Sequence, residues 1–277
     1  MILVTGATGN IGRPLVSDLH RRGALPVRAL SREPARAGLP EGVEVVEGDL
    51  ADPGSVVPAL KGARAFFLLS GHGAEADLLA AAREAGVGHV VLISSLAVGT
   101  HPHLRAVAGH LAAERLLRDS GMAWTVLRPT RFASNALWWA DSIRTEGLVR
   151  VPYPDVGLPA VHPAGIAAVA RVALTGPGHA GRVYEVAGPE RVTPREQAAA
   201  LSAVLGRDVG VVRTDPEEAR REPAALIGED GAAGVLDLTG RDLTDDLVRV
   251  RDTVPRITGA PARTFREWAA GQRAAFC

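Results

Sequence analysis

A glycine-rich loop near the N-terminus has residue types and a spacing suited to binding a dinucleotide. Its glycines recur every third residue, after the apolar run Ile2–Thr5 and before a helical stretch. Glycine permits a tight strand-to-helix turn and a close approach of the backbone to a pyrophosphate, which the first N–H groups of the helix attract. A tight turn without a ligand is the alternative, but the flanking strand and helix favour a dinucleotide. The cofactor contacts expected in this loop are Gly6, Thr8, Gly9, Asn10, Ile11 and Gly12.

The end of the second apolar run bears on which nicotinamide cofactor is bound. An acidic residue there would accept a hydrogen bond from the ribose 2′-hydroxyl of NAD(H), whereas an arginine would pair with the 2′-phosphate of NADP(H). The chain has Arg32 at this point, with Ser31 as a second donor, which favours NADP(H). The alternative is that Arg32 is a solvated loop residue and that Glu33 takes the acidic role.

Polar residues also follow the third and fourth apolar runs, and open α/β sheets bind ligands at the carboxyl ends of their strands. The further cofactor contacts expected at these two ends are Asp49, Leu50, Ser70 and Gly71. The Asp49 carboxylate would accept a hydrogen bond from the adenine amino group. The alternative for Asp49 is an N-cap or a turn.

A parallel sheet would bring these residues together, and the chain has the pattern for one. Up to about residue 130, short apolar runs alternate with helical stretches, as a sheet covered on both faces requires. The expected strands are Ile2–Thr5, Pro26–Leu30, Val43–Val46, Ala65–Leu69, His89–Ser94 and Thr125–Leu127. The expected helices between them are Ile11–Arg22, Gly54–Leu60, Ala74–Ala85 and Leu104–Asp119. The fold class is therefore α/β, a doubly wound parallel-sheet Rossmann fold.

The regular alternation ends after Pro129. We expect one domain over residues 1–277, with a Rossmann core at 1–130 and mostly a small C-terminal substrate-binding lobe at 131–277. The elements expected in the second part are a helix at Gly165–Leu174, a strand at Arg182–Val186, and helices that begin at the capping boxes Thr193/Glu196 and Thr264/Glu267. Residues 214–240 are rich in Glu, Ala and Gly, and we expect them to be loosely structured.

Composition limits the classes of partner. Lys plus Arg and Asp plus Glu both total 31, so the formal net charge is zero and gives no electrostatic signal for nucleic acid or an anionic membrane. No apolar run approaches the roughly 20 residues of a membrane span. The one cysteine, Cys277, excludes an internal disulfide and a cysteine-based metal site, and no metal is expected. Because the first strand begins at Ile2, we expect no targeting segment and a cytoplasmic location. The sequence leaves the oligomeric state open between a monomer and a homodimer.

Several motifs together resemble a known family. They are Thr5–Gly12 (TGATGNIG), Gly48–Leu50, Ile93–Ser95, Thr125–Pro129 and Thr258–Phe265. With them the chain resembles the NmrA-like branch of the atypical short-chain dehydrogenases/reductases over nearly its whole length. The resemblance implies a Rossmann domain with a small C-terminal lobe, NADP(H) in the crevice and a substrate between the two parts. It does not imply one reaction, because the branch includes reductases of quinones and enones as well as cofactor-sensing proteins.

The chain departs from the relatives that reduce ordinary carbonyl groups. Those relatives carry Tyr-x-x-x-Lys on the helix after the fifth strand, where the tyrosine supplies the proton and the lysine lowers its pKa. Here Ala106 stands at the tyrosine position and His110 at the lysine position, while the two tyrosines, Tyr153 and Tyr184, lie far downstream. Reduction of a simple ketone with a tyrosine acid is therefore not expected.

His110 shares a helix face with Ala106 and Glu114, one turn away on either side. If this face lines the cofactor, His110 holds the nicotinamide ribose or delivers a proton near neutral pH. The alternative is a partly exposed histidine paired with Glu114. We expect His101 and His103, which flank a proline, to be solvated loop residues.

The ends of strands five and six, with the segment that follows, form the expected nicotinamide and substrate side. Ser94 or Ser95 faces the nicotinamide, and Ser95 is preferred as the hydroxyl that orients the substrate. The resemblance places Pro129 and Thr130 beside the carboxamide. The expected substrate contacts are Phe132, Asn135, Trp138, Trp139 and His162. Core packing of one tryptophan and helix capping by His162 are the alternatives.

These residues favour an NADPH-dependent reductase of a small conjugated or aromatic acceptor such as a quinone or enone. The anion formed in such a reaction is delocalised and takes its proton from water, so positioning suffices and no Tyr/Lys pair is needed. The alternatives are an NADP(H)-sensing protein without catalysis and a redox-neutral isomerase or epimerase. An open cavity on the nicotinamide side would favour the reductase, because a sensor does not require one.

Overall fold

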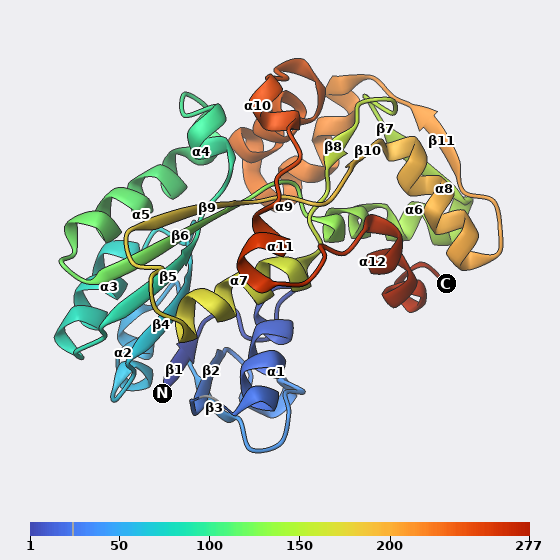
Figure 1. Cartoon of the computed structure of the whole chain (residues 1–277). Coiled ribbons are helices and arrows are strands. Elements are labelled where there is room, and N and C mark those ends of the chain that lie inside the picture. The colour runs from blue at the N-terminus through green and yellow to red at the C-terminus, as the bar shows by residue number, and fades with distance from the viewer. Residues whose placement is uncertain (24) are drawn as a thin grey trace.

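Seven parallel strands form the central sheet of the computed structural model, in the order β3-β2-β1-β4-β5-β6-β9 (Figure 1). The structure describes residues 1–23 and 25–277, apart from the side chains of Glu222 and Leu226. The strands are β1 (Ile2–Val4), β2 (Val27–Ser31), β3 (Glu44–Glu47), β4 (Ala65–Leu69), β5 (His89–Ile93), β6 (Ala123–Pro129) and β9 (Arg182–Val186). This order confirms the doubly wound Rossmann fold, with the topological switch between β1 and β4.

Helices cover both faces of the sheet because successive strand residues point to opposite sides. Ile2 and Val4 belong to one buried cluster, whereas Leu3 between them belongs to the other. The first cluster lies under α1 (Gly12–Arg22), α7 (Pro163–Thr175) and α11 (Thr253–Thr258). The second lies under α2 (Pro53–Leu60), α3 (Glu75–Glu84) and α5 (Ala108–Asp119). Figure 1 shows the two groups of helices on either side of the strands.

The second half of the chain forms a lobe at one end of the sheet, with its own apolar core around Trp139, Leu201, Phe265 and Trp268. Its helices and strands are α6 (Ala140–Glu146), β7 (Leu148–Val151), β8 (Leu158–Pro159), β10 (Arg191–Val192), α8 (Pro194–Leu205), β11 (Gly210–Arg213) and α12 (Phe265–Gly271). Both expected capping boxes are present and begin α8 and α12. The remaining short helices are α4 (Ala97–Thr100), α10 (Asp245–Val248) and the 3₁₀ turns Pro34–Arg36, Arg105–Val107, Ala133–Trp139 and Arg273–Phe276.

Residues 214–240 are not loosely structured, and that prediction is wrong. Helix α9 (Pro216–Leu236) begins where the Asp215 side chain accepts from two backbone N–H groups of the first turn. The helix kinks at Gly228 (φ 74°) and runs into a π-helical turn at Asp237–Arg241. We call residues 216–241 the closing segment. Pro223 and the glycines of the closing segment interrupt the helical pattern in the sequence, so the helix was not predicted. Asp215-Pro216 is nevertheless an ordinary helix-start signal.

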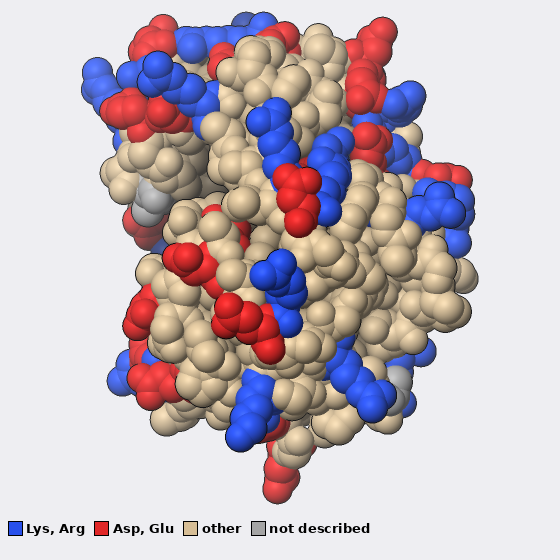
Figure 2. Space-filling model, turned by 90° about the vertical axis from the view of Figure 1, so that its left-hand side faces the viewer, with Lys and Arg blue, Asp and Glu red and all other residues tan. Residues whose placement is uncertain are grey.

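Acidic and basic side chains are interspersed over the face shown in Figure 2, as the equal numbers of the two charges would suggest. Within the described residues, no helix combines the length and apolar character needed to cross a membrane.

Candidate active site

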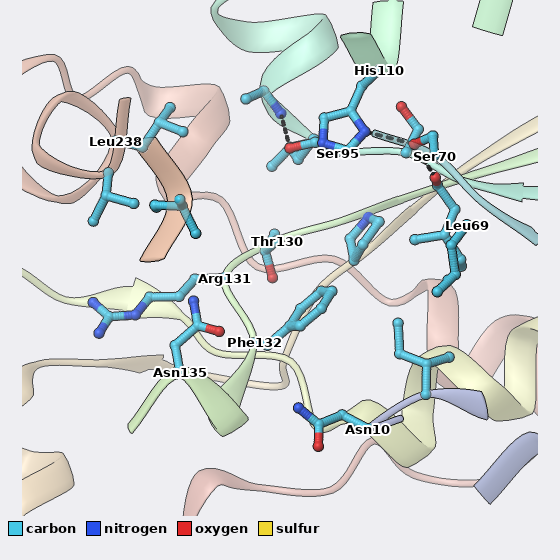
Figure 3. Close-up of a pocket in the computed structure, with 18 of the residues that line it drawn as sticks. Asn10, Leu69, Ser70, Ser95, His110, Thr130, Arg131, Phe132, Asn135 and Leu238 are labelled. Carbon is cyan, nitrogen blue, oxygen red and sulfur yellow. Dashed lines mark hydrogen bonds between the residues drawn. The ribbon is translucent and has the colours of Figure 1, made fainter. Parts of the chain in front are cut away.

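A cavity of about 630 Å³ opens at the carboxyl ends of β1, β4, β5 and β6, between the sheet and the lobe (Figure 3). Many residues singled out from the sequence lie in its wall. They are Gly6, Gly9, Asn10, Ile11, Gly12, Ser70, Ser94, Ser95, His110, Pro129, Thr130, Phe132, Asn135 and Trp138. The parallel strands thus bring together, at one edge of the sheet, side chains that are more than 100 residues apart in the chain.

The three glycines of the loop have different structural roles. Gly6 has a left-handed backbone (φ 57°), and a Cβ at Gly12 would overlap the carbonyl oxygen of Gly6, so both are needed to dock α1 on β1. A Cβ at Gly9 would meet only the carbonyl oxygen of Gly6, at 3.2 Å, and would otherwise stand in the space above the loop. Ile11, at the N-cap of α1, has no side-chain acceptor for the first N–H groups of the helix. The loop therefore offers free backbone donors and room for a pyrophosphate, and it fits the dinucleotide expected there.

Other expected cofactor contacts lie outside this wall: Thr8, Arg32, Asp49, Leu50 and Gly71. Leu50 is buried in the core, and the Asp49 carboxylate accepts from the N–H of Ala51 at 3.0 Å, which is the turn role. Arg32 is exposed directly after β2. The Glu33 carboxylate beside it is engaged by Arg36 at 3.0 Å.

His110 is held by the end of β4. Its Nδ1 lies 2.6 Å from the Oγ of Ser70, and that hydroxyl donates to the carbonyl oxygen of Ile93. Because the carbonyl can only accept, the serine proton points there, and Nδ1 of His110 must be the donor to Ser70. Burial lowers the pKa of His110, with partial compensation by Glu75 and Glu114. At neutral pH the ring is therefore neutral, with Nε2 as an acceptor.

Glu114 does not pair with His110, so the pairing in the alternative interpretation is wrong, although the histidine is partly exposed. The Glu114 side chain is fully buried and accepts two hydrogen bonds from the guanidinium of Arg128, each of 2.8 Å, and one from Ser94 Oγ of 2.7 Å. Burial opposes ionisation of Glu114, but the donors of Arg128 and Ser94 outweigh it and hold the pKa below its usual value. This cluster locks α5 against β5 and β6, and thereby fixes the turn that carries His110.

Ser95 is the serine that remains available, because Ser94 is engaged by Glu114. The Oγ of Ser95 accepts from the N–H of Ala97 at 3.2 Å, which leaves its own proton to donate into the cavity. Figure 3 shows Ser95 and Ser70 on either side of the His110 ring, above Thr130.

The closing segment occupies the place where a tyrosine acid would stand. Helix α9 packs on the 3₁₀ turn Arg105–Val107, and a Cβ at Gly234 would lie 2.5 Å from the Cβ of Ala106. A tyrosine at position 106 is incompatible with α9 in this position.

Several wall residues were missed in the sequence, and most come from the closing segment and its neighbours. They are Arg131, Leu158, Pro159, Ile227, Val235, Leu238, Thr239 and Leu247, beside smaller contributions from the strand ends. The spacing of Val235 and Leu238 by one helical turn is the signal that would have indicated a helix face.

Of the other histidines considered in the sequence, His101 and His162 have structural roles. His101 is 1% exposed, with Nε2 2.9 Å from the carbonyl oxygen of Asp242, so the expectation of a solvated residue is wrong; the chain after the closing segment covers it. His103 is exposed, as expected. His162 lies outside the cavity wall and caps α7, its Nδ1 accepting from the N–H of Ala164 at 3.0 Å. Burial, aided by Arg263, lowers the pKa of His162 to about 4, so the cap is neutral.

The two adjacent tryptophans divide between the cavity and the core. Trp138 lines the cavity, whereas Trp139 is 8% exposed and packs in the apolar core of the lobe. Trp139 is therefore not in the wall of this cavity and lines only a smaller one on the lobe side.

A doubly wound sheet with a glycine-loop cavity closed by a lobe defines an NAD(P)H-binding Rossmann protein. The NAD(P)H-binding family model matches residues 6–147, just over half of the chain, and the chain belongs to this family. It is an oxidoreductase whose cofactor is NAD(P)H.

The similar proteins include reductases over the full length of the chain. The (4-alkanoyl-5-oxo-2,5-dihydrofuran-3-yl)methyl phosphate reductase of Streptomyces griseus is 42% identical over 100% of this chain and 99% of that protein. The NAD(P)H azoreductase of Xenophilus azovorans is 37% identical over 100% and 99%. Among solved structures, the Escherichia coli NADPH-dependent quinone oxidoreductase in complex with NADPH superposes with a TM-score of 0.81 at 26% identity, covering 98% of this chain and 99% of that one.

Proposed function

We propose that this protein is an NADPH-dependent reductase of a small conjugated acceptor of the quinone or enone type. The observation that carries the proposal is the cavity of about 630 Å³, which continues from the glycine loop past His110 to an apolar wall contributed by the lobe. A cofactor-sensing protein does not need such a space, whereas a reductase must admit an acceptor beside the nicotinamide.

The cofactor, when bound, supplies a hydride. The glycine loop would hold its pyrophosphate, and Nε2 of His110 would accept from a ribose hydroxyl beside β4. Ser95 would donate to the acceptor oxygen, where negative charge increases during the reaction. Phe132 and Trp138 would flank the flat acceptor.

The absence of a tyrosine acid favours conjugated acceptors over simple ketones. A ketone requires a proton at its oxygen as that atom becomes an alkoxide, and Ala106 cannot supply one. An enone or quinone yields a delocalised anion that takes its proton from water. The similar proteins support this class, because a dihydrofuranone, a quinone and an azo compound are all conjugated.

Arg32 supports the choice of NADPH over NADH. It stands at the end of β2, where the adenosine ribose lies in Rossmann folds, and its exposed guanidinium suits a 2′-phosphate. The neighbouring carboxylate of Glu33 is engaged by Arg36, which disfavours a role for it at a 2′-hydroxyl.

A panel assay tests the proposal. The purified protein is mixed with NADPH and, separately, with menadione, an α-acyl butenolide, an azo dye and cyclohexanone, and the loss of NADPH absorbance is followed. We expect turnover with one or more of the conjugated acceptors and none with cyclohexanone. Tight binding of NADPH without oxidation by any conjugated acceptor would contradict the proposal, as would a preference for the simple ketone.

A further inference from the structure

Arg131 stands at the junction of two cavities. A second, smaller cavity of about 110 Å³ lies in the lobe, and both cavities are lined by Arg131, Trp138, Val235 and Thr239. Arg131 lies two residues beyond the end of β6, so the strand end that lines the nicotinamide side also carries this side chain. The guanidinium is therefore within reach of a molecule that occupies the first cavity and extends toward the lobe.

The charge of Arg131 has no carboxylate partner among the side chains that the structure describes. The other internal arginines are paired: Arg128 with Glu114, Arg171 with Asp18 and Arg251 with Glu185. The guanidinium of Arg131 instead lies over the ring of Trp139, 5.8 Å from its centroid, a contact that attracts a cation without neutralising it. Burial lowers the pKa of Arg131 to about 10, so it remains charged at neutral pH.

The described residues that line the two cavities include no Asp or Glu. A guanidinium that is partly removed from water without an anion is unfavourable, and that cost is relieved when an anion binds. The amide of Asn135 lies beside Arg131 (Figure 3), and no side-chain hydrogen bond engages it among the described residues. The two side chains together offer a charged planar donor and a neutral donor, which suits an oxyanion.

We propose that Arg131, assisted by Asn135, binds an anionic group of the acceptor, a phosphate or a carboxylate. This inference rests on the proposed reductase function and narrows its substrate class to conjugated acceptors that carry an oxyanion. The cofactor is the other source of phosphate, but Figure 3 places Arg131 apart from Asn10 of the glycine loop, on the side of Asn135 and Leu238. The anion belongs to the acceptor.

A pair of acceptors that differ in charge tests the inference. The probes are an α-acyl butenolide with a phosphooxymethyl group at the β-carbon and the same compound with a hydroxymethyl group. We expect Arg131→Met to lower kcat/KM for the phosphate by about 10- to 100-fold, mostly through KM, and to change the neutral compound by less than about threefold. Arg131→Lys should recover part of the loss, and inorganic phosphate should compete with the phosphorylated acceptor in the wild type.

Control experiments distinguish binding of the acceptor anion by Arg131 from binding of the cofactor phosphates and from a packing role. Arg195→Met, which removes a lobe arginine paired with Asp155, should leave the ratio between the two acceptors unchanged. Calorimetric titration should give the same NADPH Kd for the wild type and Arg131→Met; weaker NADPH binding would assign Arg131 to the cofactor phosphates. Equal losses for both acceptors, with a lowered Tm, would make Arg131 a packing residue on Trp139. Either result overturns the inference while the reductase function stands. Reduction of menadione or the azo dye but of neither butenolide would also overturn the inference alone, whereas reduction of no conjugated acceptor by the wild type would refute both.

Discussion

The two walls of the cavity are built in different ways. The cofactor wall consists of backbone and short side chains at the ends of β1, β4, β5 and β6, each next to its neighbour in the sheet. The acceptor wall consists of larger side chains from the lobe and the closing segment, among them Trp138 and Leu238. A backbone cradle tolerates little change in sequence, whereas a wall of side chains can be rebuilt without disturbing the sheet. Cofactor binding and acceptor choice should therefore respond to different substitutions.

Gly9→Val should have the largest effect of the substitutions considered, and the effect should be on NADPH binding at the cofactor wall. The valine side chain would occupy the space of the pyrophosphate, so we expect NADPH binding to fall below detection in a calorimetric titration. A Cβ at Gly9 meets only the Gly6 carbonyl oxygen at 3.2 Å, so the Tm should remain close to that of the wild type. Gly12→Ala is the comparison, because its Cβ would overlap backbone and should lower the Tm. Unchanged NADPH affinity in Gly9→Val would remove the loop from the cofactor site.

His110→Ala should lower kcat by about 10- to 100-fold, the low end of a general acid's contribution, because we assign His110 a positioning role. Its neutral Nε2 accepts only while the ring is unprotonated, and burial lowers its pKa below the usual 6.5. Wild-type activity should therefore be constant above pH 6.5 and fall only at lower pH. His110→Asn, which keeps an acceptor, should recover part of the rate. A larger loss, with a pH–rate profile governed by one group near pH 6.5, would make His110 the acid instead.

Arg32→Ala should weaken NADPH binding by about tenfold or more and leave NADH binding unchanged, since a charge-assisted pair to phosphate contributes about 1.5–3 kcal/mol. Arg21→Ala is a matched control, because Arg21 is also exposed but lies on α1 and is engaged by Asp18. Calorimetric titration of the wild type and the variants with NADPH and with NADH measures these affinities. An NADH affinity equal to that of NADPH in the wild type would show that the assignment of Arg32 is wrong.

Gly234→Leu should have the smallest effect of the substitutions considered, and the effect should be on acceptor binding at the acceptor wall. The added side chain would press on Ala106 and displace α9, and overpacking of this kind costs about 1–3 kcal/mol. We expect KM for the acceptor to rise about fivefold or more, with NADPH affinity unchanged. Gly271→Leu in α12, where a Cβ would meet open space, is the control. A parallel loss of NADPH affinity would show that the two walls are not independent.

The difference between the cofactor wall and the acceptor wall also explains which parts of the structure could be predicted from the sequence. All six expected strands are present, each boundary within two residues, because buried parallel strands are continuous apolar runs between helices. The ends of β1 and β5, with helix α5, bring Gly9, Ser95 and His110 into one wall. Prediction failed for the closing segment, because Pro223 and Gly228 interrupt its pattern and it becomes a wall only by packing on Ala106. The burial of His101 could not be predicted either, because it depends on packing against Asp242, about 140 residues away in the chain.

The transfer of deuterium from the cofactor to the acceptor tests the central claim most directly. The wild-type protein is incubated with an α-acyl butenolide and NADPH deuterated at nicotinamide C4, each of the two C4 epimers being used in turn, and the product is analysed by mass spectrometry and NMR. The account predicts that one epimer places a single deuterium on the carbon β to the carbonyl groups, where it does not exchange with water. Consumption of the acceptor without deuterium in the product from either epimer would contradict the proposed hydride transfer.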